Sequence, residues 1–491
     1  MTQAQIDAAC EAFKDTRREW ERSEAFLYGS ASDNELDPHI DSWPLDHKEL
    51  ENALKNPTLV AGFKGSDPAK FVSENNNEEK FELPEVGQAT VNVSSSDKEM
   101  QKVAKVYVDQ VVYPTYKALA ANARTLYTTT AALYSAAEAG TMTQAQIDAA
   151  CEAFKDTRRE WERSEAFLYG SASDNELDPH IDSWPLDHKE LENALKNPTL
   201  VAGFKGSDPA KFVSENNSHF QSVLGFHGME FVLFRDGKNR TVDALKANET
   251  EEGMTSVKGI DELAFLQAVA ADVRNITALL EFTWMGSAAS NETKSVLSNA
   301  SYVFSSLRYN GLAANGTMCY GQFLLSPSVT TGYNSWQGTI RQIFVGGCSN
   351  ICAEVADQKL GQAYRTATGS GSAEDSRDYI ESPYSHRSFI DYQDNIYSIK
   401  NTLYGTRDVN ATSPAEHSLL NLLKAMNYSG LNDLTEALNK AIQSLETAKN
   451  SGKSFVEAPG AQHVKDCIDA VSALDEELNK AGDWVNKQEA L

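Results

Sequence analysis

Apolar residues recur at helical spacing along most of the chain from about residue 97 onward. This pattern predicts helices over about 97–139, 143–168, 260–286, 291–307, 335–364, 387–404, 413–427, 431–449 and 460–486. Thr143 is expected to cap the second helix, and Pro114 to kink the first, because proline breaks the backbone hydrogen-bond ladder. Alternating patterns typical of strands occur only in short stretches such as 89–93. The chain is therefore predicted to be all-α.

One apolar stretch, residues 225–234, carries a histidine and a carboxylate three positions apart. On a helix, His227 and Glu230 project side by side from one face, and the apolar spacing around them indicates that this face is buried. A buried carboxylate needs compensation, which a metal ion supplies. An ordinary buried ion pair is the alternative. Gly225 and Gly228 weaken the helix and suggest close backbone approach.

Two isolated ligands do not complete a metal site, so the chain needs further oxygen or nitrogen donors. Glu162 and Glu165 lie three positions apart on the predicted helix 143–168, and Asp182 lies in the long loop that follows. We take these three carboxylates as candidates to complete the metal's ligands. A solvated charged face, or a carboxylate that caps a helix, is the alternative interpretation for each of them.

Length and charge limit the classes of function. A chain of 491 residues exceeds one compact core, so two or three units are expected. The net charge of -26 argues against nucleic acid as a partner and against a basic patch that binds an anionic membrane. The chain contains no run of 18 or more apolar residues, so no membrane-spanning helix is predicted. The first 20 residues are polar and charged and do not resemble a signal peptide. Cys348 and Cys352 are expected to be buried free thiols.

Residues 1–76 are identical to residues 142–217. Natural repeats diverge, so perfect identity points to a very recent duplication or to an artificial origin in a cloned or assembled sequence, and we favour the artificial origin. Residues 77–96 are acidic and rich in serine, which is typical of a tether. The protein proper is therefore predicted to begin near residue 77.

Three separate motifs resemble those of the imelysin family, whose members are classified as M75-type peptidases. They are Trp-Glu-x-Ser-Glu-Ala-Phe at 161–167, with Asp-Pro-x-Ile-Asp-Ser-Trp-Pro-Leu-Asp at 178–187; the Gly-x-His-x-x-Glu signature at 225–230; and Glu-Ser-Pro-Tyr-Ser-His at 381–386, with Asp391 and Asn395 beyond it. The resemblance covers about residues 97–491. It implies two four-helix-bundle-like halves, 97–249 and 250–491, with the His/Glu motif near their interface.

The resemblance also implies an exported protein, either periplasmic or an outer-membrane lipoprotein of a Gram-negative bacterium, attached through a lipid anchor absent from this chain. Several relatives act in iron uptake. The pocket is then expected to be lined by Trp184 and, from the opposite wall, by Ser382, Ser385 and His386. A metal ion or a small metal-bearing ligand is the expected ligand. A second exported protein that acts in metal uptake is the expected protein partner.

Two hypotheses from different classes follow. The first is a binding protein that holds a divalent or ferric ion, iron or zinc, for metal acquisition. The second is a metal-dependent peptidase that uses His227 and Glu230, although the His-Glu-x-x-His motif of zinc peptidases is absent. A serine hydrolase is excluded, because adjacent Ser385 and His386 rarely reach nucleophile–base geometry and no Gly-x-Ser-x-Gly elbow occurs.

Overall fold

The computed structural model describes residues 97–488 except 217–220, 307–312, 314–317 and 328–332, together with isolated positions among residues 1–96. The chain separates into two compact units, Met1–Glu82 and Leu83–Leu491. The predictions for residues 1–76 and 77–96 concern stretches that the structure describes only at isolated positions, and the alternating stretch 89–93 lies outside the described residues. The fold described below belongs to the second unit.

The first predicted helix is interrupted where its proline falls. It consists of α7 (Lys98–Tyr107), a π-helical turn η2 (Val108–Val112) and α8 (Tyr113–Glu138). Pro114 occupies the first turn of α8, where a missing N–H costs little, and the π turn takes up the break. The kink predicted at Pro114 stays a prediction.

Helix α9 (Gln144–Glu162) starts where the sequence predicts and ends earlier. Thr143 caps it, and its side chain and that of Gln146 form a reciprocal capping box. The predicted end at about residue 168 is wrong, because the chain leaves the helix at Arg163 and forms a separate 3₁₀ turn, η3 (Glu165–Phe167). Glu162 and Glu165 therefore do not share a helix.

Short helices fill the segment up to the His/Glu motif. They are α10 (Ser171–Asp174), α11 (Leu177–Ile181), α12 (His188–Lys196), α13 (Pro198–Phe204), α14 (Pro209–Asn216), η5 (Gln221–Val223) and α15 (Gly225–Leu233). After α15 the chain forms two small antiparallel hairpins, one from β1 (Phe234–Arg235) and β2 (Lys238–Asn239) and the other from β3 (Asn248–Glu249) and β4 (Val257–Lys258). Helix α16 (Val242–Lys246) and η6 (Glu251–Gly253) lie among them.

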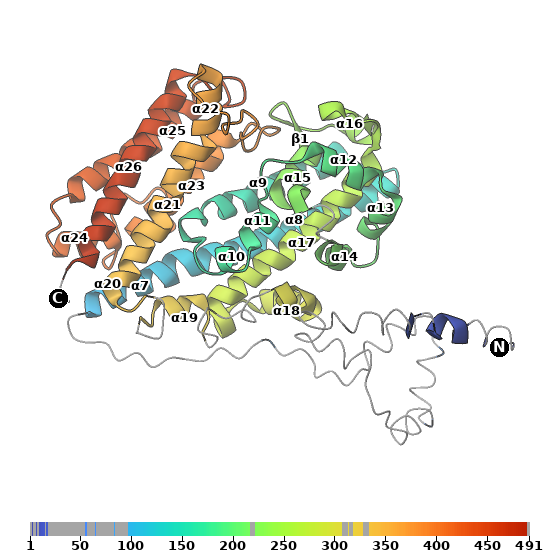
Figure 1. The fold of residues 1–491 in the computed structure, drawn as a ribbon, viewed down its shortest axis with the longest axis horizontal. Helices are drawn as coiled ribbons and strands as arrows, with labels where there is room; N and C mark the ends of the chain where they lie inside the picture. The colour runs from blue at the N-terminus through green and yellow to red at the C-terminus, as the bar shows by residue number, and fades with distance from the viewer. Residues whose placement is uncertain are drawn as a thin grey trace. The chain divides into compact units, whose positions relative to one another are not determined.

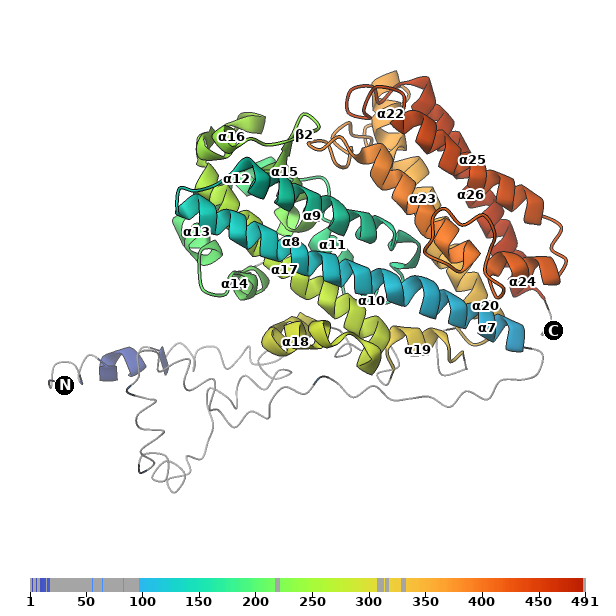
Figure 2. The ribbon, with the colours of Figure 1, turned by 180° about the vertical axis from the view of Figure 1, so that it is seen from behind.

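Helix α17 (Gly259–Met285) is the central helix of this part of the fold, and it runs beside α8 in both views (Figures 1 and 2). It is the one helix among the described residues that is long and apolar enough to cross a membrane. However, 94% of its most apolar window is buried inside the protein. Burial on every face explains why it is apolar all round, as core helices of large proteins are.

Four short elements after α17 pack against it: η7 (Gly286–Ala288), α18 (Asn291–Asn299), η8 (Ser301–Ser306) and α19 (Tyr320–Leu324). The remaining chain forms a second group of helices (Figures 1 and 2). Its elements are α20 (Trp336–Arg341), η9 (Gln342–Ser349), α21 (Asn350–Ala353), η10 (Glu354–Lys359), α22 (Gly361–Thr368), α23 (Ser388–Tyr404), α24 (Leu419–Ala425), α25 (Leu431–Lys449) and α26 (Gln462–Asn486). Helices α25 and α26 pack side by side, and α23 packs on α25 and on α9. The all-α prediction is confirmed; the division into two four-helix-bundle-like halves stays a prediction.

Several details depart from the predicted pattern in this region. The predicted helix over 335–364 is a series of α and π turns, because η9 and η10 interrupt it. A short helix, α19, lies outside the helices that the pattern predicts. Cys348 and Cys352 are buried free thiols, as predicted.

Candidate metal centre

Two glycines bring α15 close to the loop that precedes it. Gly225 has φ +74°, and a Cβ atom there would overlap the carbonyl oxygen of Ile181. A Cβ at Gly228 would overlap the carbonyl oxygen of Val223. The close backbone approach predicted from the glycines is confirmed, and it places His227 against the residue after Ile181.

His227 is buried and faces Asp182. Its Nε2 atom lies 3.0 Å from Asp182 Oδ1, and the Trp184 ring lies over the imidazole with 4.4 Å between ring centroids. Trp161 Nε1 donates to the other Asp182 oxygen at 2.7 Å. Burial works to raise the pKa of the Asp182 carboxyl, but Arg158 and His227 outweigh it and hold that pKa well below its usual range. Asp182 is therefore a fixed anion.

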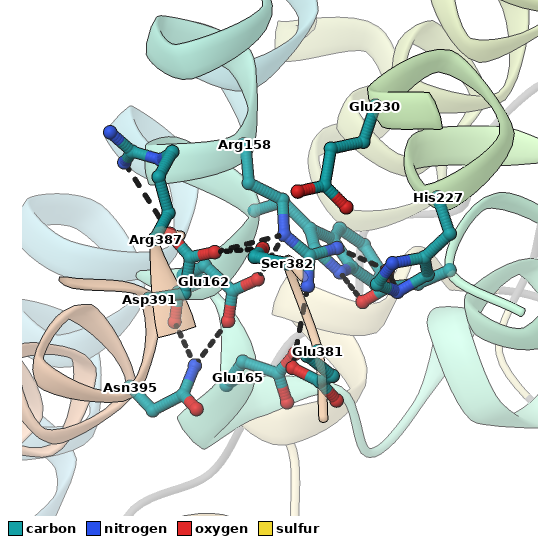
Figure 3. A network of polar contacts seen from close by, with 12 residues as sticks. Arg158, Glu162, Glu165, His227, Glu230, Glu381, Ser382, Arg387, Asp391 and Asn395 are labelled. Atoms are coloured by element: carbon teal, nitrogen blue, oxygen red, sulfur yellow. Dashed lines mark hydrogen bonds and ion pairs between the residues drawn. The ribbon is translucent and has the colours of Figure 1, made fainter. Parts of the chain in front are cut away.

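Glu230 projects from the same helix and meets different partners. One of its carboxylate oxygens, Oε1, accepts hydrogen bonds from the Ser385 backbone N–H at 2.8 Å and the Ser385 hydroxyl at 2.6 Å. The other oxygen, Oε2, is buried and has no hydrogen-bond partner among the described residues. Burial raises the pKa of this carboxyl. Both side chains of the motif point toward Arg158 (Figure 3).

Arg158, on α9, lies at the centre of the polar network (Figure 3). Its Nε forms an ion pair with Glu162 and its Nη1 with Asp182. Its Nη2 lies 3.5 Å from Glu381, and its Nε 4.0 Å from Asp391. The side chain is 1% exposed, so this cation interacts with carboxylates from three separate parts of the chain with almost no solvent to screen the interactions.

Glu162 and Glu165 are both buried, so the interpretation of a solvated charged face is wrong for them. The reason lies far along the chain: helix α23 covers this end of α9, and Asn395 on α23 donates to Glu162 Oε2 at 2.5 Å. Burial raises the pKa of Glu162 to about 8 and that of Glu165 well above its usual range. Each of these carboxyls binds its proton more tightly than a carboxyl in water does.

A second buried cation lies on the far side of these acids. Lys359, at the end of the π-helical segment η10, is 2% exposed, and its Nζ lies 3.2 Å from Glu381 and 3.8 Å from Glu165. π-Helical turns change the direction in which a side chain points and are frequent at functional sites. Here the turn aims a lysine at the acids instead of at solvent.

The turn 381–387 closes the network from the C-terminal side. Ser382 Oγ donates to Asp391 Oδ2 at 2.5 Å, and Arg387 Nη2 lies 3.4 Å from the other Asp391 oxygen. Ser382 and His386 have φ +53° and +55°, a conformation that strains residues other than glycine, and such strain gathers at functional sites. The turn therefore holds its serines toward buried carboxylates.

The residues predicted to line a pocket divide into two sets. Ser382 and Ser385 contact the buried carboxylates, as described above. Trp184 and His386 line a neighbouring cavity of about 470 Å³, together with Tyr384 and Arg235. The Ser385 hydroxyl donates to Glu230, whereas His386 lies in the wall of the cavity.

Among the described residues, one group of acidic side chains has the spacing of a metal site. Glu162, Glu165 and Asp182 each offer an oxygen within 4.8 Å of the others. We call these three residues the carboxylate triad. His227 and Glu230 are not members of this group, although His227 contacts it through Asp182. Oxygen donors alone suit hard cations such as ferric iron.

Several residues of the network were not predicted as site residues. Arg158, Lys359, Glu381, Asp391 and Asn395 all face the triad or its neighbours. A local signal existed for Arg158, which lies four positions before Glu162 on the same helix, the spacing of a helical ion pair. For the others the contacts span long stretches of sequence, so spacing along the chain carried no signal.

One family model matches most of the chain. The family model described as Imelysin, Peptidase M75, matches residues 1–101 and 112–479. The chain belongs to the imelysin family. The match starts earlier than the resemblance drawn from the motifs, and residues 1–76 within it carry the same letters as 142–217.

Individual relatives of this imelysin-family chain cover less of it. Iron-regulated protein A of Synechococcus elongatus is 32% identical over 128 residues, which is 26% of this chain and 30% of that protein. A crystal structure assigned to an iron-regulated protein A precursor of Parabacteroides distasonis has a TM-score of 0.59 at 24% identity, over 83% of this chain and 99% of that chain. An imelysin-like protein of Psychrobacter arcticum scores 0.44 at 12% identity, over 79% and 95%. The Parabacteroides structure shows a shared fold.

Proposed function

We propose that this imelysin-family chain binds a multivalent metal ion, iron above all, at the carboxylate triad and serves metal acquisition. The observation that carries the proposal is the group of three carboxylates, two on buried residues and one on partly buried Asp182, with oxygens within 4.8 Å of one another. Burying several acids together is costly unless cations offset them. Arg158 and Lys359 offset part of that charge, and a bound metal ion would offset the rest.

The chemistry of the donors supports iron over zinc. All three triad members offer oxygen, whereas zinc sites are usually built from histidine and cysteine. His227, the imidazole beside the triad, is paired with Asp182. The buried Glu230 Oε2 atom, which has no partner among the described residues, supplies one more oxygen nearby. The partial similarity to a protein named iron-regulated protein A is consistent with this choice.

The cellular setting is part of the proposal. We place the protein after export, in the periplasm or on a membrane through a lipid anchor, where it would pass metal to a partner in uptake. The support is that the structurally similar Parabacteroides chain is described as a precursor. For the peptidase alternative the support is the family's description as Peptidase M75; no contact among the described residues favours it.

Metal content and affinity of the full-length protein test the proposal. Purified protein is dialysed anaerobically against Fe²⁺ and separately against Zn²⁺, and bound metal is measured by inductively coupled plasma mass spectrometry. Asp182→Asn is expected to weaken iron binding by at least ~10-fold, the lower end of what even a supporting residue of a metal site contributes. Glu152→Gln, on the exposed side of α9, is the control that should bind like the wild type.

Three outcomes decide between the functions. Iron binding that Asp182→Asn weakens, without cleavage of casein, supports the metal-binding function. Casein cleavage that is abolished by a chelator and restored by Zn²⁺ or Fe²⁺ would support the peptidase instead. Equal binding by the wild type and Asp182→Asn would remove the triad as the site.

A further inference from the structure

Arg158 lies among the oxygens that the proposed metal ion would need. Its guanidinium contacts Glu162 through Nε and Asp182 through Nη1, which are two of the three triad members. The side chain is 1% exposed, so water takes little part in these contacts. A cation of the protein itself thus interacts with most of the candidate site.

The other oxygens of the same two carboxylates are held by neutral groups. Trp161 Nε1 donates to Asp182 Oδ2 at 2.7 Å, and Asn395 Nδ2 donates to Glu162 Oε2 at 2.5 Å. Neutral donors can keep their hydrogen bonds beside a bound cation. A guanidinium cannot share the site in the same way, because like charges repel strongly where the local dielectric is low. At Glu162 and Asp182, Arg158 is therefore the contact that an incoming cation has to break, while Lys359 lies 3.8 Å from the third member, Glu165.

The surroundings offer Arg158 an alternative position. Its Nη2 already lies 3.5 Å from Glu381, and its Nε 4.0 Å from Asp391. The guanidinium carbon lies 5.2 Å from the centre of the Phe226 ring, within the range of a cation–π contact. If the side chain moves away from the triad, the contacts with Glu381, Asp391 and the Phe226 ring still stabilise its positive charge. Displacement therefore does not leave a buried cation alone.

We propose that Arg158 is an internal counter-ion that competes with the metal ion for the carboxylate triad. The inference rests on the proposed function. Without metal, Arg158 holds Glu162 and Asp182 together. A multivalent cation displaces it toward Glu381 and Asp391. A monovalent cation does not, because it carries no more charge than the group it would replace. Arg158 thereby sets the affinity of the site and restricts the substrate to multivalent cations.

Substitution of Arg158 tests the competition. If Arg158 competes with the metal ion, its removal raises the metal affinity; if it only supports the triad structurally, its removal lowers the affinity or leaves it unchanged. Full-length wild type, Arg158→Gln and Arg159→Gln are titrated with Mn²⁺ at pH 8, and free Mn²⁺ is measured by electron paramagnetic resonance. Anaerobic dialysis against Fe²⁺ repeats the measurement. Arg158→Gln is expected to bind at least ten times more tightly than wild type. Arg159, partly exposed on the same helix, is the matched control and should leave the affinity unchanged.

A measurement on the wild type covers the case in which Arg158→Gln does not fold. Protein with ¹⁵N-labelled arginine is titrated with Zn²⁺, which is diamagnetic, and the Nε–H resonance of Arg158 is assigned from its loss in Arg158→Lys. Displacement from Glu162 predicts that this resonance moves while that of Arg159 stays. A resonance that does not move at saturating Zn²⁺ would overturn the inference.

The failures of the two proposals are distinguishable. If the wild type binds Mn²⁺ or Fe²⁺ and Arg158→Gln binds equally or more weakly, the inference is overturned while metal binding stands. Arg158 would then be a structural partner of the triad. If neither wild type nor Arg158→Gln binds any of these ions, the proposed function itself fails.

Discussion

Glu162 makes the stability of this protein depend on pH in an unusual direction. Its side chain is fully buried, and burial raises its pKa to about 8, although Arg158 alone would lower it. In the unfolded chain the same group has its ordinary pKa near 4.5. As the pH rises above 4.5, the unfolded state releases this proton first, and the folded state keeps it until about pH 8. Between these values the contribution of Glu162 to stability therefore falls as pH rises.

The magnitude follows from the width of that window. Inside the window the free energy of unfolding changes by up to about 1.4 kcal/mol per pH unit for one proton, which amounts to on the order of 4 kcal/mol across it. Glu162→Gln replaces the carboxyl with a group that is neutral at every pH. The variant should therefore match wild type near pH 5 and exceed it in stability at pH 8.

Urea unfolding at pH 5, 6, 7 and 8, followed by far-UV circular dichroism, measures the difference. Other acids, among them partly buried Asp178, also have a raised pKa, so the stability of the wild type falls with pH for more than one reason. Wild type and variant are therefore compared at each pH. Glu152→Gln, exposed on the same helix, is the control and should follow the wild-type curve. Parallel curves for wild type and Glu162→Gln would refute the assignment of a raised pKa to this carboxyl.

Two further substitutions test the contacts around the motif. Gly225→Ala should lower the free energy of unfolding by about 2–5 kcal/mol in urea titrations, because the new Cβ overlaps the Ile181 carbonyl in addition to straining the backbone. Gly253→Ala carries the strain without the overlap, so a loss as large as that of Gly225→Ala would contradict the close approach. Ser385→Ala removes one donor from buried Glu230 and should cost about 1–2 kcal/mol by the same measurement. No change for Ser385→Ala would show that this hydrogen bond is absent in solution.

Features governed by neighbouring residues could be predicted from the sequence. The Thr143 cap and the bounds of α17 and α25 depend on local propensity and spacing, and the structure has them where the pattern places them. The end of α9 was misplaced, because the apolar pattern continues through η3 while the backbone changes its hydrogen bonding. Periodicity reports which face is buried, not which hydrogen bonds form.

The candidate site could be predicted only in part. Its acids were recognised as ligand types, but their burial was not, since it depends on α23, whose Asn395 lies 233 positions from Glu162. In the sequence, Arg158 is one of several positively and negatively charged residues on the predicted helix 143–168. Its role appears only when the loop after α11 and the turn 381–387 bring Asp182 and Glu381 to it.

The close packing of α15 against the preceding backbone limits which substitutions this motif can accept. Gly225 and Gly228 bear no functional group, yet an added methyl at either would meet a backbone carbonyl oxygen, which cannot rotate aside as a side chain does. Substitutions should therefore be tolerated at these two positions as rarely as at His227 and Glu230. A homologue that kept His and Glu but replaced either glycine would have to re-route the backbone beneath the helix.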